Sequence, residues 1–236
     1  MFRGLYSGAS ALDNLSRRHQ VTASNLAHLN STGHRRTVFS LSERTDLDAA
    51  GNRMPGSMHD SAVDFKTSGR LEMTQRPLDL SIRGDGFFQF QGENEAIYSR
   101  NGVLFRNVDG QLQNADGLPL IGDNGPIVIP PEVPDGKIVI AADGTISADG
   151  TNLGRISAVS FNNNRLLASD SQISFRAGSA VASPAEEVSI VQGSRELSNA
   201  QPVTELINLI ISSRHFENAQ RAIKTISETM QQGIRE

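Results

Sequence analysis

Serine, histidine and acidic side chains are the groups of this chain that could carry catalysis, and Ser10 comes nearest to a nucleophile motif. It lies in Gly8-Ala9-Ser10-Ala11-Leu12, which lacks the final glycine of a Gly-x-Ser-x-Gly turn. That motif also needs a sharp turn from a strand into a helix, whereas Ser10 lies within a helical pattern. We therefore assign no acyl-transfer nucleophile.

Gly84-Asp85-Gly86-Phe87-Phe88 begins like a dinucleotide-binding fingerprint, in which glycines let the backbone approach a pyrophosphate. The third glycine is missing, and the segment runs into a strand pattern instead of opening a helix. We interpret it as a turn, and we predict no bound cofactor.

The histidines supply the nitrogen ligands that zinc prefers, but their spacing does not support a metal site. His19, His28, His34, His59 and His215 contain no His-x-x-x-His pair. His19 falls on the apolar stripe of a predicted helix and His28 on its flank, so both are interpreted as polar interruptions of a packing surface. The chain has no cysteine, which excludes disulfides and thiolate ligands.

Aspartates recur through the middle of the chain and raise the question of calcium binding or glycoside hydrolysis. Nearly all precede Gly or Asn, as in Asp109-Gly110 and Asp143-Gly144. Asp in such pairs hydrogen-bonds its own backbone and Gly supplies the positive φ of a tight turn. No Asp-x-Asp-x-Asp-Gly loop or paired catalytic glutamates accompany them. The sequence therefore predicts turns, and a protein that is not an enzyme.

A first helix of about 25 residues is predicted at the N-terminal end, because apolar or small residues recur there at heptad spacing. Asn30-Ser31-Thr32-Gly33 predicts its end, with Gly33 at the C-cap. The stripe consists of Leu5, Gly8, Leu12, Leu15, His19, Thr22, Leu26 and Leu29.

A second helix is predicted at the C-terminal end, where Asn199 and Pro202 suit a capping position and an early-turn proline. Its stripe consists of Leu206, Leu209, Ser213, Phe216, Gln220, Ile223, Ser227, Met230 and Ile234. Ile207, Ile210 and Ile226 widen this stripe, so we expect more than one partner helix. The predicted assembly interface comprises Leu5, Leu12, Leu15, Leu26, Leu29, Leu206, Leu209, Phe216, Ile223, Met230 and Ile234.

Two interpretations of these helices remain open at this point. They could cover the central sheet of a compact monomer, as amphipathic helices commonly do. Their place at the two ends leaves them few tethers, and isolated helices are marginal in water. The second interpretation is therefore that the two terminal helices pair with each other, or that neighbouring copies of the chain complete their apolar core.

Between the helices, short β-branched runs separated by Asp-Gly and Asn-Gly pairs predict antiparallel β structure. The candidate strands are Gly86–Phe90, Ala96–Ser99, Gly102–Asn107, Gln111–Asn114, Pro126–Ile129, Lys137–Ala141, Thr145–Ser147, Arg155–Asn162, Arg165–Ala168 and Val188–Gln192. The predicted core includes Phe87, Phe88, Phe90, Phe105 and Phe161.

The sequence thus predicts an α+β fold, in which long N- and C-terminal helices form a coiled coil and a mainly antiparallel β domain is inserted between them. Residues 1–36 and 197–236 would form the helical assembly core, and residues 67–196 the β domain. Residues 37–66 have little apolar periodicity and are predicted as a linker or arm.

Charge and hydropathy argue against nucleic acid and membrane partners. The net charge is −4, and residues 1–36 carry five arginines against one aspartate. These arginines are dispersed and lack interleaved aromatic residues, so we predict no nucleic-acid binding. No stretch approaches the roughly 20 apolar residues of a membrane span, and the N-terminus lacks a secretory apolar run. We predict no direct membrane insertion and, if the chain is exported, another route than a cleaved signal.

Several segments together resemble the flagellar axial proteins of bacteria, in particular the basal-body rod proteins FlgF and FlgG. Residues 23–36, ASNLAHLNSTGHRR, are similar to that family's ASNLAN…NT-x-GF-(K/R) signature, with His28 and His34 in place of the usual Asn and Phe. Further similar segments are Arg76-Pro77-Leu78-Asp79, Gly84-Asp85-Gly86-Phe87-Phe88, Tyr98-Ser99-Arg100-Asn101-Gly102, Asp143-Gly144-Thr145-Ile146, Leu153-Gly154-Arg155-Ile156, Ser198-Asn199 and Arg214-His215-Phe216-Glu217.

The resemblance implies a structural subunit of the flagellar basal-body rod, located in the periplasm. Its terminal helices would pair as a coiled coil in the inner tube of the rod, with the β domain outside. The implied partners are other rod subunits, copies of the chain itself and the flagellar type III export apparatus. The central region resembles FlgF slightly more than FlgG. A distal-rod or hook subunit of the same family is an alternative, as is a carbohydrate-binding or adhesive β protein.

Overall fold

The computed structural model describes residues 2–47, 53–185 and 187–233, and the chain divides into two compact units. The helical unit comprises Met1–Ala27, Arg36–Asp64 and Ala200–Glu236. The β unit comprises His28–Arg35 and Phe65–Asn199. Each unit is therefore assembled from segments that are far apart in the sequence.

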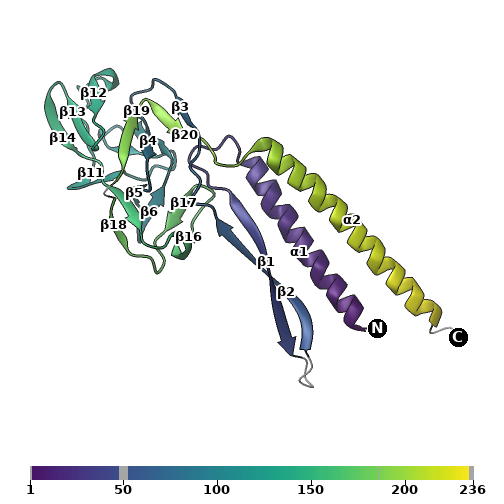
Figure 1. The fold of residues 1–236 in the computed structure, drawn as a ribbon. Coiled ribbons are helices and arrows are strands. Elements are labelled where there is room, and N and C mark those ends of the chain that lie inside the picture. Colours follow the sequence, from purple (N-terminus) through teal and green to yellow (C-terminus); the bar gives the residue numbers. More distant parts are fainter. Residues whose placement is uncertain (1, 48–52, 186, 234–236) are drawn as a thin grey trace. The chain divides into compact units, whose positions relative to one another are not determined.

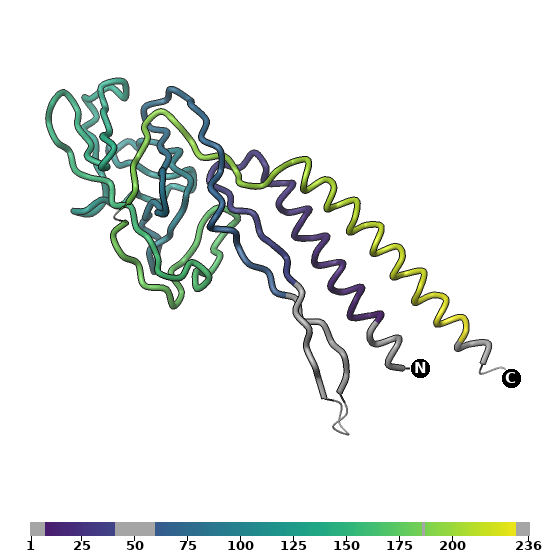
Figure 2. The backbone as a smooth tube through the Cα atoms, viewed as in Figure 1, coloured from purple at the N-terminus to yellow at the C-terminus, as the bar shows by residue number. Residues whose placement is uncertain are grey.

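Two long helices dominate the helical unit. α1 (Phe2–Ala27) and α2 (Pro202–Gly233) lie side by side and run antiparallel (Figure 1), and the backbone trace in Figure 2 shows the same pairing. α2 begins at Pro202, as predicted, because a first-turn residue needs no N–H donor within the helix. α1 ends at Ala27. The sequence predicts that this helix includes His28 and Leu29, but both residues lie beyond its observed end.

A long hairpin also belongs to the helical unit, in the segment to which the sequence assigns no strand. β1 (Thr37–Leu47) and β2 (Arg53–Val63) pair antiparallel with a continuous register. At the base of the hairpin, Arg36 Nε donates to Asp64 Oδ2 at 3.1 Å, and Asp64 N donates to Arg36 O at 2.9 Å. Pairing between two local strands does not need a buried face, so a search for apolar alternation misses it.

The β unit consists of short strands, and each strand pair that the structure describes is antiparallel, as predicted. Its largest sheet has the order β16 (Ala168–Ser169), β17 (Ser174–Arg176), β6 (Ala96–Ser99), β5 (Phe87–Gln91), β15 (Ala158–Phe161) and β18 (Ala182–Pro184). A three-stranded sheet has the order β12 (Ile138–Ile140), β13 (Thr145–Ala148) and β14 (Thr151–Arg155). Another has the order β19 (Ser189–Gln192), β4 (Asp79–Arg83) and β7 (Gly102–Val103).

Smaller elements complete the β unit. The two-stranded pairs are β20 (Ser194–Glu196) with β3 (Leu71–Met73), β8 (Phe105–Arg106) with β9 (Leu112–Gln113), and β10 (Ile121–Gly122) with β11 (Gly125–Pro126). Single 3-10 turns lie at η1 (Asp135–Lys137) and η2 (Asn164–Leu166).

Several predicted strands are found within one residue of their predicted ends, among them Ala96–Ser99, Lys137–Ala141 and Val188–Gln192. Others are wrong. Of Arg165–Ala168, the first two residues lie in η2 and only Ala168 lies in a strand, and of Pro126–Ile129 only Pro126 lies in a strand. Short apolar runs do not by themselves distinguish strands from irregular buried chain, which explains these errors.

The core of the β unit is aliphatic and aromatic. Its fully buried side chains include Phe88, Phe90, Leu80, Leu104, Leu112, Leu120, Ile129 and Ile146. Phe87 and Phe161 are also buried, as predicted, but Phe105 is 41% exposed. Phe105 is adjacent in β8 to Arg106, whose strand partner Leu112 is buried, and the guanidinium of Arg76 lies 4.6 Å from the Phe105 ring centroid. Alternation in the strand places Phe105 on the solvent face.

The turn interpretation of the aspartates is confirmed at Asp143. Its Oδ1 accepts from the backbone of Thr145 at 3.0 Å, and Gly144 has φ of +90°. The backbone hydrogen bond from Thr145, followed by the one from its hydroxyl, holds the pKa of Asp143 below its usual range. This carboxylate closes a turn in the way that Asp commonly does.

Candidate assembly interface

A glycine of α1 lies against an isoleucine of α2. A Cβ placed on Gly8 of α1 would lie 2.8 Å from Cγ1 of Ile223 of α2. Eleven residues further along α1, His19 Nδ1 lies 3.2 Å from Ser212 Oγ, which is eleven residues back along α2. The two helices therefore keep a constant antiparallel register across this stretch. By the same register Leu15 is level with Phe216.

Polar residues lie in the contact between the helices. Thr22 and Ser212 are buried, at 5% and 0% exposure. The hydroxyls of Thr22 and Ser212 donate to the carbonyls of Arg18 and Leu209. The predicted role of His19 as a polar interruption is confirmed by its contact with Ser212. Buried polar groups in a helix pair favour the register in which they find partners.

Apolar side chains also gather on the opposite side of α2, which we call the outer apolar face. Its members are Val203, Leu206, Ile207, Ile210 and Ile211, which are 69%, 46%, 52%, 54% and 38% exposed. At the helical repeat of 3.6 residues they lie on the side opposite to Ser212 and Ile223. Exposed apolar clusters of this kind mark surfaces that bind other proteins.

The predicted interface residues are distributed over several environments. Leu12 and Ile223 line one groove between the helices, and Leu15, Leu26, Leu209 and Phe216 are partly buried. Leu206 lies on the outer apolar face and not against α1. Leu29 lies in the β unit. The side chains of Leu5 and Met230, and the whole of Ile234, fall outside the described residues.

Asn25 of the signature segment fixes the start of the hairpin to α1. Its Nδ2 donates to Thr37 O, and its Oδ1 accepts from Thr37 N, both at 2.9 Å. The amide thus pairs with Thr37 as a neighbouring strand would. Because Asn25 is only 3% exposed, water does not readily replace these bonds.

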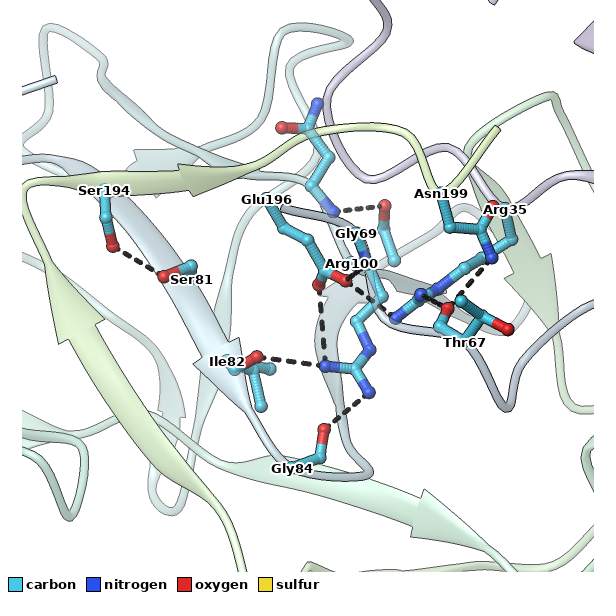
Figure 3. Close-up of polar contacts among 12 residues, drawn as sticks. Arg35, Thr67, Gly69, Ser81, Ile82, Gly84, Arg100, Ser194, Glu196 and Asn199 are labelled. Atoms are coloured by element: carbon cyan, nitrogen blue, oxygen red, sulfur yellow. Dashed lines mark hydrogen bonds and ion pairs between the residues drawn. The ribbon is translucent and has the colours of Figure 1, made fainter. Parts of the chain in front are cut away.

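In the β unit, a buried ion cluster joins the segment after α1 to the segment before α2 (Figure 3). Glu196 Oε1 lies 2.9 Å from Arg35 Nη2, and Glu196 Oε2 lies 3.6 Å from Arg100 Nη1. The three side chains are 2–3% exposed. Glu196 Oε1 also accepts from Gly69 N at 2.8 Å. Arg35 and Arg100 lie in segments that resemble the family's motifs, but neither those segments nor any other pattern indicated Glu196 or a contact among the three side chains.

Further hydrogen bonds surround the ion cluster. Gly33 N donates to Glu196 O at 2.7 Å, and Asn199 Nδ2 donates to Thr67 O at 2.9 Å. Gly33 is not the predicted helix C-cap. It has φ of +73°, and a Cβ there would lie 2.4 Å from Asn101 N. The glycine is therefore required for a close approach of two chain segments.

The two histidines of the signature segment stack on each other in the β unit. The rings of His28 and His34 lie 5.2 Å apart at 22°, and His34 Nδ1 lies 3.1 Å from Ser198 Oγ. Burial, followed by the neighbouring His28, lowers the pKa of His34 to about 4. His34 is therefore neutral at neutral pH.

Across the described residues, no group of three or more His, Cys, Asp or Glu side chains is arranged to hold a metal ion. None of the helices that the structure describes is both long and apolar enough to cross a membrane.

Comparison with known proteins shows extended similarity to flagellar proteins. Residues 81–148 match the family described as "Flagellar hook protein FlgE/F/G D1 domain", and residues 191–236 match "Flagellar basal body rod FlgEFG protein C-terminal". The first match lies within the β unit, and the second includes all of α2.

Relatives that match over nearly the whole chain are flagellar basal-body rod proteins. The chain is 32% identical to "Flagellar basal-body rod protein FlgF" of Salmonella typhimurium, over 97% of this chain and 95% of that protein. It is 30% identical to FlgF of Caulobacter vibrioides, over 99% and 97%. It is 26% identical to "Flagellar basal-body rod protein FlgG" of Bacillus subtilis, over 98% of each chain.

Proposed function

This chain belongs to the family of bacterial flagellar basal-body rod proteins that includes FlgF and FlgG, and we propose that it enters the rod by packing the outer apolar face of α2 against neighbouring subunits. It is a structural subunit of the flagellar basal body and not an enzyme. The two relatives with at least 30% identity that are named above are FlgF proteins, so we assign the chain to the FlgF type of rod subunit.

The outer apolar face is the single observation that carries this proposal. Five aliphatic side chains within Val203–Ile211 are 38% or more exposed in the isolated chain. Removing an aliphatic side chain from water contributes about 1.5–3 kcal/mol when burial is complete. A neighbouring helix that covers this face therefore gains stability that the isolated chain cannot obtain.

Within each subunit, the proposal gives α1 and α2 the role of a coiled-coil pair. The contacts Gly8–Ile223 and His19–Ser212 support that role. The predicted residues Leu12, Leu15, Leu26, Leu209, Phe216 and Ile223 then stabilise the pair. Leu206 binds the next subunit. The predicted core segments, residues 1–36 and 197–236, act in assembly through α1 and α2, while their residues His28–Arg35 and 197–199 belong to the β unit. Residues 37–66 form an arm, and residues 67–196 the outer β domain.

In this proposal the helix pair of the free chain forms but is only marginally stable and opens readily, and assembly stabilises it. Two helices that pack mainly on each other bury only a narrow strip of side chains. Helices without further tertiary partners are only marginally stable in water. The β unit, by contrast, has its own apolar core. Such a chain passes through the type III export apparatus of the flagellum before assembly and gains its helical partners afterwards.

Limited proteolysis of the purified full chain tests this coupling. We expect a monomer in which trypsin cleaves both terminal helices early and leaves a resistant core near residues 66–196. Incorporation into rods should protect the same helices. A monomer whose ends are fully protected would contradict coupled ordering.

A further inference from the structure

A small polar cavity lies within the β unit beside the buried ion cluster. It has a volume of about 60 Å³, and its lining includes Arg35, Arg100, Asp85 and Asn164 together with the aromatic rings of Phe87 and Phe161. A water molecule needs roughly 10–15 Å³ on this measure, so the cavity has room for one small ion or a few waters.

Unsatisfied polar atoms concentrate at this cavity. In the part of the chain that the structure describes, four buried side-chain atoms make no hydrogen bond: Arg35 Nη2, Arg100 Nε, Glu196 Oε2 and Asn164 Oδ1. Three of them belong to lining residues, and Glu196 joins the two arginines. The ion pair between Arg35 and Glu196 is short at 2.9 Å, but Nη2 does not point along a hydrogen-bond direction. Buried donors without acceptors are costly unless another group occupies the site.

The charge of the cluster identifies the missing partner. Among the buried groups, two guanidinium groups share the carboxylate of Glu196, which leaves an excess of one positive charge. The other carboxylate of the lining, Asp85, is exposed, so water screens its charge. Arg100 uses Nη1 and Nη2 on the carbonyls of Ile82 and Gly84 (Figure 3), which are neutral acceptors. Burial, and to a smaller extent the positive charge of Arg35, lowers the pKa of Arg100 to about 10 although Glu196 and Asp85 oppose the shift, so the two carboxylates do not fully compensate it.

We propose that this cavity binds a small monovalent anion such as chloride. Arg35 Nη2 and Arg100 Nε donate to it, and the rings of Phe87 and Phe161 line the same space. Asn164 presents its amide nitrogen to the anion after rotation of the side-chain amide, whose two orientations have nearly the same shape. The exposed carboxylate of Asp85 also lines the cavity; it repels any anion, and a divalent anion such as sulfate about twice as strongly as chloride.

Chloride titration of the full chain tests this site independently of rod assembly. Thermal unfolding is followed from 0 to 500 mM chloride, with gluconate keeping the ionic strength constant. We expect a saturable rise of about 4 °C in Tm, because an anion that binds only the folded state stabilises it. A Tm that does not depend on chloride would overturn the proposal and leave water as the occupant.

The variant Asn164→Asp replaces the side-chain amide at the cavity by a carboxylate of nearly the same shape. We expect this variant to melt higher than the natural chain without chloride and to lose its response to chloride. Asn162→Asp, which adds the same charge two residues away at an exposed position, should keep the response. An unchanged response in Asn164→Asp would contradict the site.

Bromide identifies the position of the ion directly. Crystals of the full chain soaked in bromide should give an anomalous peak between Arg35 and Arg100. An ordered water there, without anomalous signal, would rule out the anion even if chloride raises Tm by another route.

Discussion

Gly8 of α1 lies directly against Ile223 of α2, so close that a Cβ on the glycine would lie 2.8 Å from the isoleucine side chain. A glycine here lets the two helix backbones approach, and the distance between packed helices depends on the side chains at their contact. The interior of a helix otherwise disfavours glycine by about 1 kcal/mol relative to alanine. The glycine at this position is therefore explained by the close approach of α1 and α2, and not by helix propensity.

Gly8→Leu should push the helices apart. We expect the free energy of unfolding of the helical unit to fall by about 1–3 kcal/mol, because a large side chain is forced into a filled contact. Leucine has the better helix propensity, so any loss reflects packing. Circular dichroism at 222 nm during heating measures the effect. Ala9→Leu, on the exposed side of α1, is the control, and equal melting of the two variants would contradict the contact.

Glu196→Gln should destabilise the β unit strongly. The variant leaves Arg35 and Arg100 buried without their carboxylate, and breaking a buried pair in this way costs about 3–5 kcal/mol. Urea unfolding followed by Tyr and Phe signals measures the change. Glu72→Gln removes the pair with Arg195, in which both side chains are 40% exposed, and should cost about 1 kcal/mol or less. Similar losses in both variants would refute a special role for Glu196.

Asn25→Ala should release the base of the hairpin from α1. Thr37 loses both of its partners from that amide, and a buried unpaired backbone group costs about 1–3 kcal/mol. Hydrogen exchange at the Thr37 amide should accelerate, while amides of the Phe88 region should be unchanged. Asn30→Ala changes an exposed asparagine and serves as control. Unchanged protection at Thr37 would contradict the pairing.

Stability should depend on pH through His34. Its pKa in the folded chain is about 4, below the usual 6.5, so the unfolded chain binds more protons between these values. The free energy of unfolding therefore falls as the pH drops from 6.5 to 4, by at most about 3 kcal/mol at 1.36 kcal/mol per pKa unit. Urea unfolding at pH 7 and pH 4.5 measures the slope.

His34→Phe restores the residue type usual in the family signature and is the control for this slope. Phenylalanine can stack on His28 as His34 does, at a ring distance of 5.2 Å, but it cannot take up a proton. We expect the variant to lose most of the pH dependence. The same slope in both chains would show that other groups cause it.

The elements that the sequence predicts well are those with a local signal. The start of α2 at Pro202 follows from helix chemistry, and the turn at Asp143-Gly144 from side-chain bonding to the backbone. The buried Phe88 and Phe90 follow from an apolar run between turns. In each case a few neighbouring residues decide the structure.

The features that the sequence does not reveal depend on distant partners. Glu196 and Arg35 are 161 positions apart, and nothing in their flanking residues indicates that they meet. The heptad stripe places Ser213 and Leu206 in the seam of α2. The structure buries Ser212 and exposes 46% of Leu206. A straight helix repeats every 3.6 residues and not every 3.5, so the stripe drifts from the heptad along the helix.

The binding of neighbouring rod subunits to the outer apolar face of α2 can be measured as the amount of this chain in purified basal bodies. Leu206→Asp with Ile210→Asp should leave the isolated chain as stable as the natural one, because both side chains are about half exposed. Thr225→Asp, which adds charge to an exposed position of the same helix, is the control. We predict at least a tenfold loss of the double variant from basal bodies, together with lost swimming, and normal levels of the control. Normal incorporation of the double variant would contradict the account.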